Sequence, residues 1–187
     1  MTFVFEFFTL AITMLIDLSA GNLGFALPAA GIVLFYFGLV GSFPRAAAAA
    51  AGYGLVLDLI YGRPYPVSAL VLPAALAAGA ALQHRIDSYL LDAAPPGAAV
   101  AFTVTLGNTL AGWLLSGRAP ETGPLIWRLL FNSAMGAAAL PAVILLLDEF
   151  GEALGLKSCR RIRLRAERHT LNAPPRRIRE PQRQGKK

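Results

Sequence analysis

The chain has 187 residues, of which 56 % are hydrophobic and 15 % charged, with a mean hydropathy of +0.55. This composition is typical of membrane proteins, and it excludes an attached nucleotide-binding or protease domain because no segment is long and polar enough to form one. The charge is unevenly placed: residues 1–156 carry five basic and nine acidic groups, whereas residues 157–187 carry twelve basic and two acidic groups. We therefore divide the chain into a transmembrane helical domain (1–150) and a basic, disordered cytoplasmic tail (151–187).

Six apolar segments follow one another through the first domain. A helix needs roughly 20 mostly apolar residues to cross about 30 Å of hydrocarbon, and the first domain has room for six such crossings. We predict an all-α integral membrane protein, a compact bundle of about six transmembrane helices; five spans, with the first segment at the membrane interface, is the alternative. The expected segments are 3–19, 23–40, 46–61, 67–82, 97–115 and 124–147.

The basic tail sets the expected orientation. Clustered Lys and Arg next to a span stay on the cytoplasmic side, so an even number of spans places both termini in the cytoplasm of a bacterial inner membrane. Each basic group near an anionic leaflet contributes about 1 kcal/mol of attraction. We expect the tail to bind anionic lipid headgroups and no nucleic acid; a solvated tail that binds nothing is the alternative. The basic residues nearest the last span are Lys157, Arg160, Arg161, Arg163, Arg165 and Arg168.

Four polar residues inside the apolar segments form the candidate site. A charge at the centre of a spanning helix costs about 2.5–3.5 kcal/mol on insertion scales, so such residues usually face the bundle interior. With six spans, Asp17, Asp58 and Arg128 lie at similar depth in the outer half, and Asn132 shares a helix face with Arg128. We expect a polar cluster in which Arg128 pairs with Asp58; the alternative is that each charge reaches the headgroups separately.

Small residues recur at a spacing that suits close helix contact in lipid. The pairs are Ala75 with Gly79, Gly107 with Ala111, and Gly52 with Gly54. We interpret them as packing sites within one bundle, with dimerisation as the alternative.

The sequence contains no arrangement of residues that predicts catalysis or metal binding. Residues 107–111 and 131–135 resemble two motifs of the lipoprotein signal peptidases, but Ala111 and Met135 stand where that family has its two aspartates. The missing carboxylates argue against that activity. We expect a protein that is not an enzyme and that carries no cofactor or metal.

The stretch 54–62, followed by residues 66–70, resembles the central motif of the rod shape-determining MreD family. Gly54, Asp58, Gly62, Ala69 and Leu70 match a Gly-x-x-x-Asp-x-x-x-Gly helix end and the alanine-leucine start of the next helix. The resemblance implies a fold similar to the S-components of vitamin transporters. It also implies a non-catalytic scaffold for peptidoglycan synthesis during cell elongation, with MreC-like and MreB-like proteins and cell-wall synthases as partners. The alternative is an S-component-like transporter subunit that binds a small molecule.

Overall fold

A computed structural model describes residues 2–22, 28–83, 91–117, 119, 121–156 and 159. Every regular element in these residues is a helix, which confirms the all-α class. The elements are α1 (Thr2–Asn22), α2 (Ala29–Val40), α3 (Phe43–Ile60), α4 (Val67–Gln83), the 3₁₀ turn η1 (Leu91–Ala93), α5 (Ala94–Ser116) and α6 (Thr122–Ala153).

Three of these helices, α3, α5 and α6, are long and apolar enough to cross a membrane. The helices α2 and α4 are apolar but shorter. With 12 residues, α2 measures about 18 Å along its axis, less than the roughly 30 Å of a hydrocarbon core. Residues 23–27 of the expected second segment lie outside the described residues, so six spans remain a prediction.

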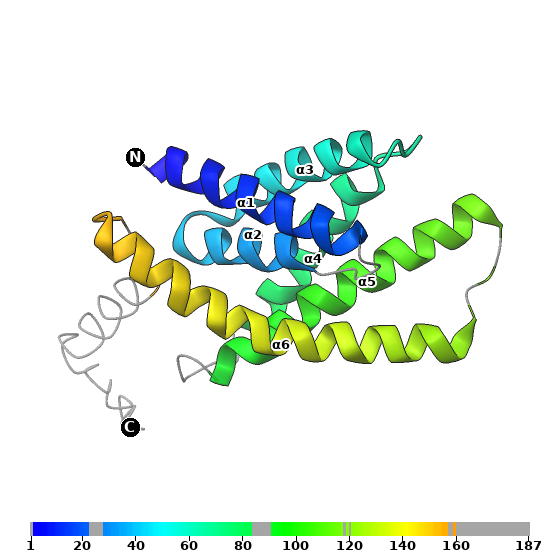
Figure 1. Cartoon of the computed structure of the whole chain (residues 1–187). Coiled ribbons are helices and arrows are strands. Elements are labelled where there is room, and N and C mark those ends of the chain that lie inside the picture. Colours follow the sequence, from blue (N-terminus) through cyan, green and yellow to red (C-terminus); the bar gives the residue numbers. More distant parts are fainter. Residues whose placement is uncertain are drawn as a thin grey trace, which may run out of the picture.

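Consecutive helices run in alternating directions (Figure 1). The N-terminus and the end of α6 lie at one end of the bundle, which we name the basal end. The ends of α1, α3 and α5 lie at the other, distal end.

The core is built around α2, which contacts each of the other five α-helices. Leu34, Phe35 and Tyr36 of α2 are almost fully buried. Because protein surrounds α2 on all sides, it needs no polar face, and this explains its uninterrupted apolar sequence. In contrast, α1 packs mainly on α2 and leaves Phe7 and Leu15 exposed.

Glycines allow the helices to approach closely. A β-carbon on Gly97 of α5 would collide with the backbone of Gly136 of α6, and the reverse also holds. Gly79 and Gly107 pack against side chains of neighbouring helices, whereas Gly52 has no atom near its missing side chain. Of the small residues singled out above, Gly79 and Gly107 therefore serve contacts inside the bundle, and Gly52 does not.

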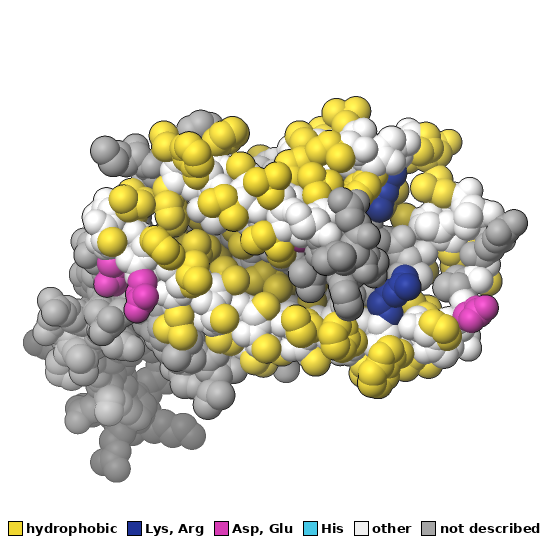
Figure 2. Space-filling view, in the orientation of Figure 1, with side chains coloured by type: hydrophobic (Ala, Val, Ile, Leu, Met, Phe, Trp, Pro, Cys, Tyr) yellow, Lys and Arg dark blue, Asp and Glu magenta, His cyan; other side chains and the backbone are white. Residues whose placement is uncertain are grey.

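The outer surface is predominantly apolar. Figure 2 shows hydrophobic side chains over most of one face, with the larger charged patches toward its two ends. Large exposed side chains occur on every long helix, for example Leu59, Leu114 and Trp127. In water such a surface is an aggregation hazard, whereas a bilayer solvates it.

The last helix continues three residues past position 150, to Ala153. Gly155 follows with a positive φ of 69° and ends the helix. Of the predicted tail (151–187), the structure describes residues 151–156, of which 151–153 are helical, and Cys159. The other residues of the tail, with their predicted disorder and contact with lipid, lie outside the described residues.

Candidate functional site

The residues of the Gly-x-x-x-Asp-x-x-x-Gly motif and of the alanine-leucine pair that follows it lie at the junction of α3 and α4. Asp58 is in the last turn of α3 and only 3 % exposed. Its Oδ2 atom accepts hydrogen bonds from the backbone N–H groups of Ser68 (2.7 Å) and Ala69 (3.3 Å). These groups belong to the first turn of α4, where backbone donors have no partner within the helix. Asp58 therefore caps the N-terminus of the neighbouring helix, and its negative charge also complements the helix dipole.

The glycines of the motif make this cap possible. One turn before Asp58, a β-carbon on Gly54 would collide with the backbone of Ser68 and Ala69. Gly62 has φ = 61°, in the left-handed region, and reverses the chain after α3. The motif residues thus act as one joint between α3 and α4.

Arg63 connects this joint to a third helix. Its Nη1 atom donates to Asp58 Oδ1 (3.3 Å), Ser68 Oγ (3.0 Å) and Asn108 Oδ1 of α5 (3.0 Å). The guanidinium also lies 5.4 Å from the centroid of the Tyr61 ring. We name Asp58, Arg63, Ser68 and Asn108 the Asp58 network. It holds α3, α4 and α5 together at the distal end.

The predicted pair of Asp58 with Arg128 is wrong. Arg63 occupies the position next to Asp58, and Arg128 is exposed on α6, with no partner among the described residues. Hydropathy places a residue at a depth along a helix, but it does not say which helices are neighbours. In this bundle α6 packs chiefly on α5, with smaller contacts to α2 and η1, and makes no substantial contact with α3.

The other two members of the predicted cluster belong to separate groups. Asp17 Oδ2 accepts from the backbone N–H of Ala30 (3.2 Å), in the first turn of α2, and from the hydroxyl of Tyr53 (3.5 Å). Asn132 Nδ2 donates to Thr105 Oγ1 on α5 (2.9 Å). The structure therefore replaces one cluster by several small groups, each joining two or three helices. Asp17 caps α2 in the same way that Asp58 caps α4.

A further polar group, which the sequence did not indicate, lies at the basal end. The hydroxyl of Tyr36 donates to Asp148 Oδ1 (2.8 Å), and both side chains are buried. The backbone N–H of Cys159 donates to the same oxygen (2.9 Å). Asp148 precedes Glu149 and looks like an ordinary charge at the end of a span. Its position at the same expected depth as Tyr36 was the signal that could have indicated a pair.

The polar groups described above each join two or three parts of the bundle. Two of their members, Asn108 and Asn132, lie in the two stretches that resemble signal peptidase motifs. Asn132 bonds to Thr105 of α5, and Asn108 accepts from Arg63 in the turn between α3 and α4. Within the described ranges, no group of three or more His, Cys, Asp or Glu residues is placed to hold a metal ion.

No protein-family model, no curated protein and no solved structure matches this chain.

Proposed function

We propose that this chain is an MreD-like scaffold subunit of the bacterial cell-elongation machinery and makes or breaks no covalent bond. The observation that carries the proposal is the joint between α3 and α4. Gly54, Asp58, Gly62 and Ala69 each have a specific part in it, as described above. A motif whose residues fix the angle and spacing of two helices suits a protein that presents a defined surface to partners.

The polar groups support the same proposal. The side chains of Asp58, Asn132 and Asp148 are buried, and each forms hydrogen bonds with another part of the bundle. Such bonds stabilise one arrangement of the helices in lipid. The outward surface is then free for contacts with lipid and with partner proteins.

Leu70 is the motif residue that faces outward. Its neighbour Ala69 is buried against Gly54, whereas Leu70 is 72 % exposed. Close by in the sequence, Leu59 of α3 is also exposed. Because Leu70 contributes little to the core, its place in the motif suggests a contact with a partner such as an MreC-like protein.

We also propose six spans, with the basal end in the cytoplasm of a bacterial inner membrane. The alternating helix directions and the twelve basic groups of the tail support this orientation. A reporter fused after Lys187 should be cytoplasmic, and one inserted in the loop between α5 and α6 should be external. The opposite result at either site would contradict the six-span topology.

Cell shape tests the function. Depletion of the chain in its own bacterium should turn rods into spheres, and the wild-type chain should restore them. Leu70→Gln should reach the membrane at normal levels but restore shape poorly. The matched control is Leu114→Gln, since Leu114 of α5 is as exposed but lies outside the motif. Rods that persist after full depletion would overturn the proposal.

A further inference from the structure

One face of α6 remains exposed along almost the whole helix. Its apolar residues follow alternating steps of three and four positions, the spacing of a seam along which two helices pack at a shallow angle. All are exposed in the bundle. We name them the α6 seam: Phe131, Met135, Ala138, Ala142 and Leu145.

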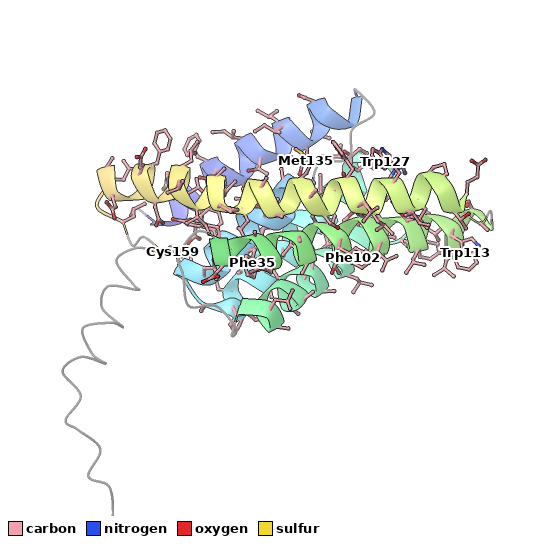
Figure 3. The ribbon with its side chains drawn as sticks, turned by 90° about the horizontal axis from the view of Figure 1, so that it is seen from below. Phe35, Phe102, Trp113, Trp127, Met135 and Cys159 are labelled. Atoms are coloured by element: carbon pink, nitrogen blue, oxygen red, sulfur yellow. The ribbon has the colours of Figure 1, made fainter. Side chains whose placement is uncertain are left out.

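The sizes of the side chains along the seam suit contact with a second helix. Ala138 and Ala142, four positions apart, are small and permit close backbone approach in lipid, while larger side chains lie on either side of them. Figure 3 shows Met135 and Trp127 on one side of the α5–α6 hairpin, and Phe102 and Trp113 on the other. The seam therefore lies on the opposite side of the hairpin from the exposed aromatic side chains of α5.

The two ends of the seam carry charges of opposite sign. Continuing the same steps reaches Arg128 toward the distal end and Glu149 toward the basal end, and both are exposed. They are 21 positions apart, or about 30 Å along the helix, close to the thickness of a hydrocarbon core. The spacing of the two charges therefore matches the distance between the two borders of a hydrocarbon core.

Arg128 differs from the other arginines whose side chains the structure describes. Arg45 pairs with Glu6 at 2.9 Å, and Arg63 pairs with Asp58. Within the described part of the chain Arg128 has no such partner, although it stands beside the apolar seam. A carboxylate at the same depth on another helix would complement it.

We propose that the α6 seam docks a single transmembrane helix of another protein, one that carries a carboxylate at its outer border and Lys or Arg at its inner border. Arg128 pairs with the carboxylate, and Glu149 faces the basic residues. Membrane helices commonly carry Lys and Arg at their cytoplasmic end, so the required pattern is an ordinary one. The inference rests on the proposed scaffold function and its orientation, and it names the kind of partner and the surface.

Two other candidate partners for the α6 seam, a second copy of the chain and lipid, fit the charges of Arg128 and Glu149 less well. A second copy of the chain, held in the same orientation by the membrane, would set Arg128 against Arg128 and Glu149 against Glu149 along this seam. Lipid would supply a phosphate to Arg128, but it would not need small residues at helix-packing spacing. The charge pattern therefore favours a different helix.

Energy transfer in vesicles tests the proposal. The full chain carries a fluorescent protein after Lys187, and the probe is a synthetic leucine–alanine transmembrane peptide with an Asp at its outer border, Lys at its inner border and an acceptor dye. We expect association with the wild-type chain. Replacing the peptide's Asp by Asn, or Arg128→Gln in the chain, should weaken it about threefold to tenfold, and the two changes together should weaken it no further.

Steric variants locate the contact. Ala138→Leu should weaken association, whereas Gly112→Leu on α5 should not, because Gly112 is also exposed, has open space around its missing side chain and lies outside the seam. Equal binding of the Asp and Asn peptides, unchanged binding to Ala138→Leu, or self-association lost in Ala138→Leu would each overturn the proposal. If the purified chain retains an MreC-like protein and the seam variants retain it equally, the seam is wrong while the scaffold function stands.

Discussion

Removing the carboxylate of Asp58 should destabilise the bundle strongly. Asp58→Ala leaves two backbone donors of α4 without an acceptor and Arg63 without its counter-charge. Hydrogen bonds to charged groups contribute about 1.5–3 kcal/mol each, and breaking one side of a buried ion pair costs about 3–5 kcal/mol in soluble cores. The Arg63 side chain is 35 % exposed, so solvent screens part of the second effect. We expect a loss of about 3–4 kcal/mol, a large part of the 5–15 kcal/mol that typically stabilises a folded protein.

Unfolding in detergent micelles, followed by the fluorescence of Trp113 and Trp127, measures this loss. Glu121→Gln is the matched control, because it removes an exposed acid and should change the unfolding free energy by less than about 0.5 kcal/mol. An Asp58→Ala variant within about 0.5 kcal/mol of wild type would refute the capping argument.

A double-mutant cycle identifies the partner of Asp58. Asp58→Asn and Arg63→Gln should couple by at least about 0.5 kcal/mol, because their side chains are in contact. Asp58→Asn and Arg128→Gln should be additive within a few tenths of a kcal/mol, roughly, since no contact joins them in the structure. Strong coupling in the second cycle would restore the pair expected from depth alone.

Three further outcomes follow from the described contacts and from the tail. Gly54→Ala should greatly reduce folded yield, whereas Gly52→Ala should be neutral or stabilising by up to about 1 kcal/mol, as thermal unfolding would show. Tyr36→Phe leaves the buried Asp148 oxygen without its hydroxyl donor and should cost about 1–3 kcal/mol in denaturant unfolding; a loss below about 0.5 kcal/mol would contradict the pair. A peptide of residues 157–187 should bind anionic vesicles more tightly than neutral ones at low salt, and equal binding would show that the tail is merely solvated.

The order of the helices was predictable from the sequence because apolar run length carries that information. All six expected segments contain a helix, and the turns at Gly41 and Gly62 lie where the chain reverses. The shortness of α2 was not predictable: an apolar run looks the same whether lipid or protein surrounds it. Only the tertiary contacts show that α2 is the core of the bundle.

The site was predictable in part. The motif identified Gly54 and Asp58, and the expectation that Asp58 faces the bundle interior agrees with its burial and its bonds to α4. The partner of Asp58 was not predictable from depth, because the side of a helix that faces the bundle depends on which neighbours the helix packs against. Residue 63 lies between the expected third (46–61) and fourth (67–82) segments, so the sequence places Arg63 in a connection and not in a span. Its proximity to Asp58 depends on the tight turn at Gly62.

Affinity purification from detergent-solubilised membranes tests the central proposal most directly. The tagged chain is isolated from the cells that naturally produce it, and the eluate is probed for an MreC-like protein and for the energising module of a vitamin transporter. The scaffold function predicts that the MreC-like protein co-purifies with wild type and is reduced with Leu70→Gln, while Leu114→Gln retains it. Recovery of the energising module without the MreC-like protein would contradict the scaffold function and identify a transporter subunit.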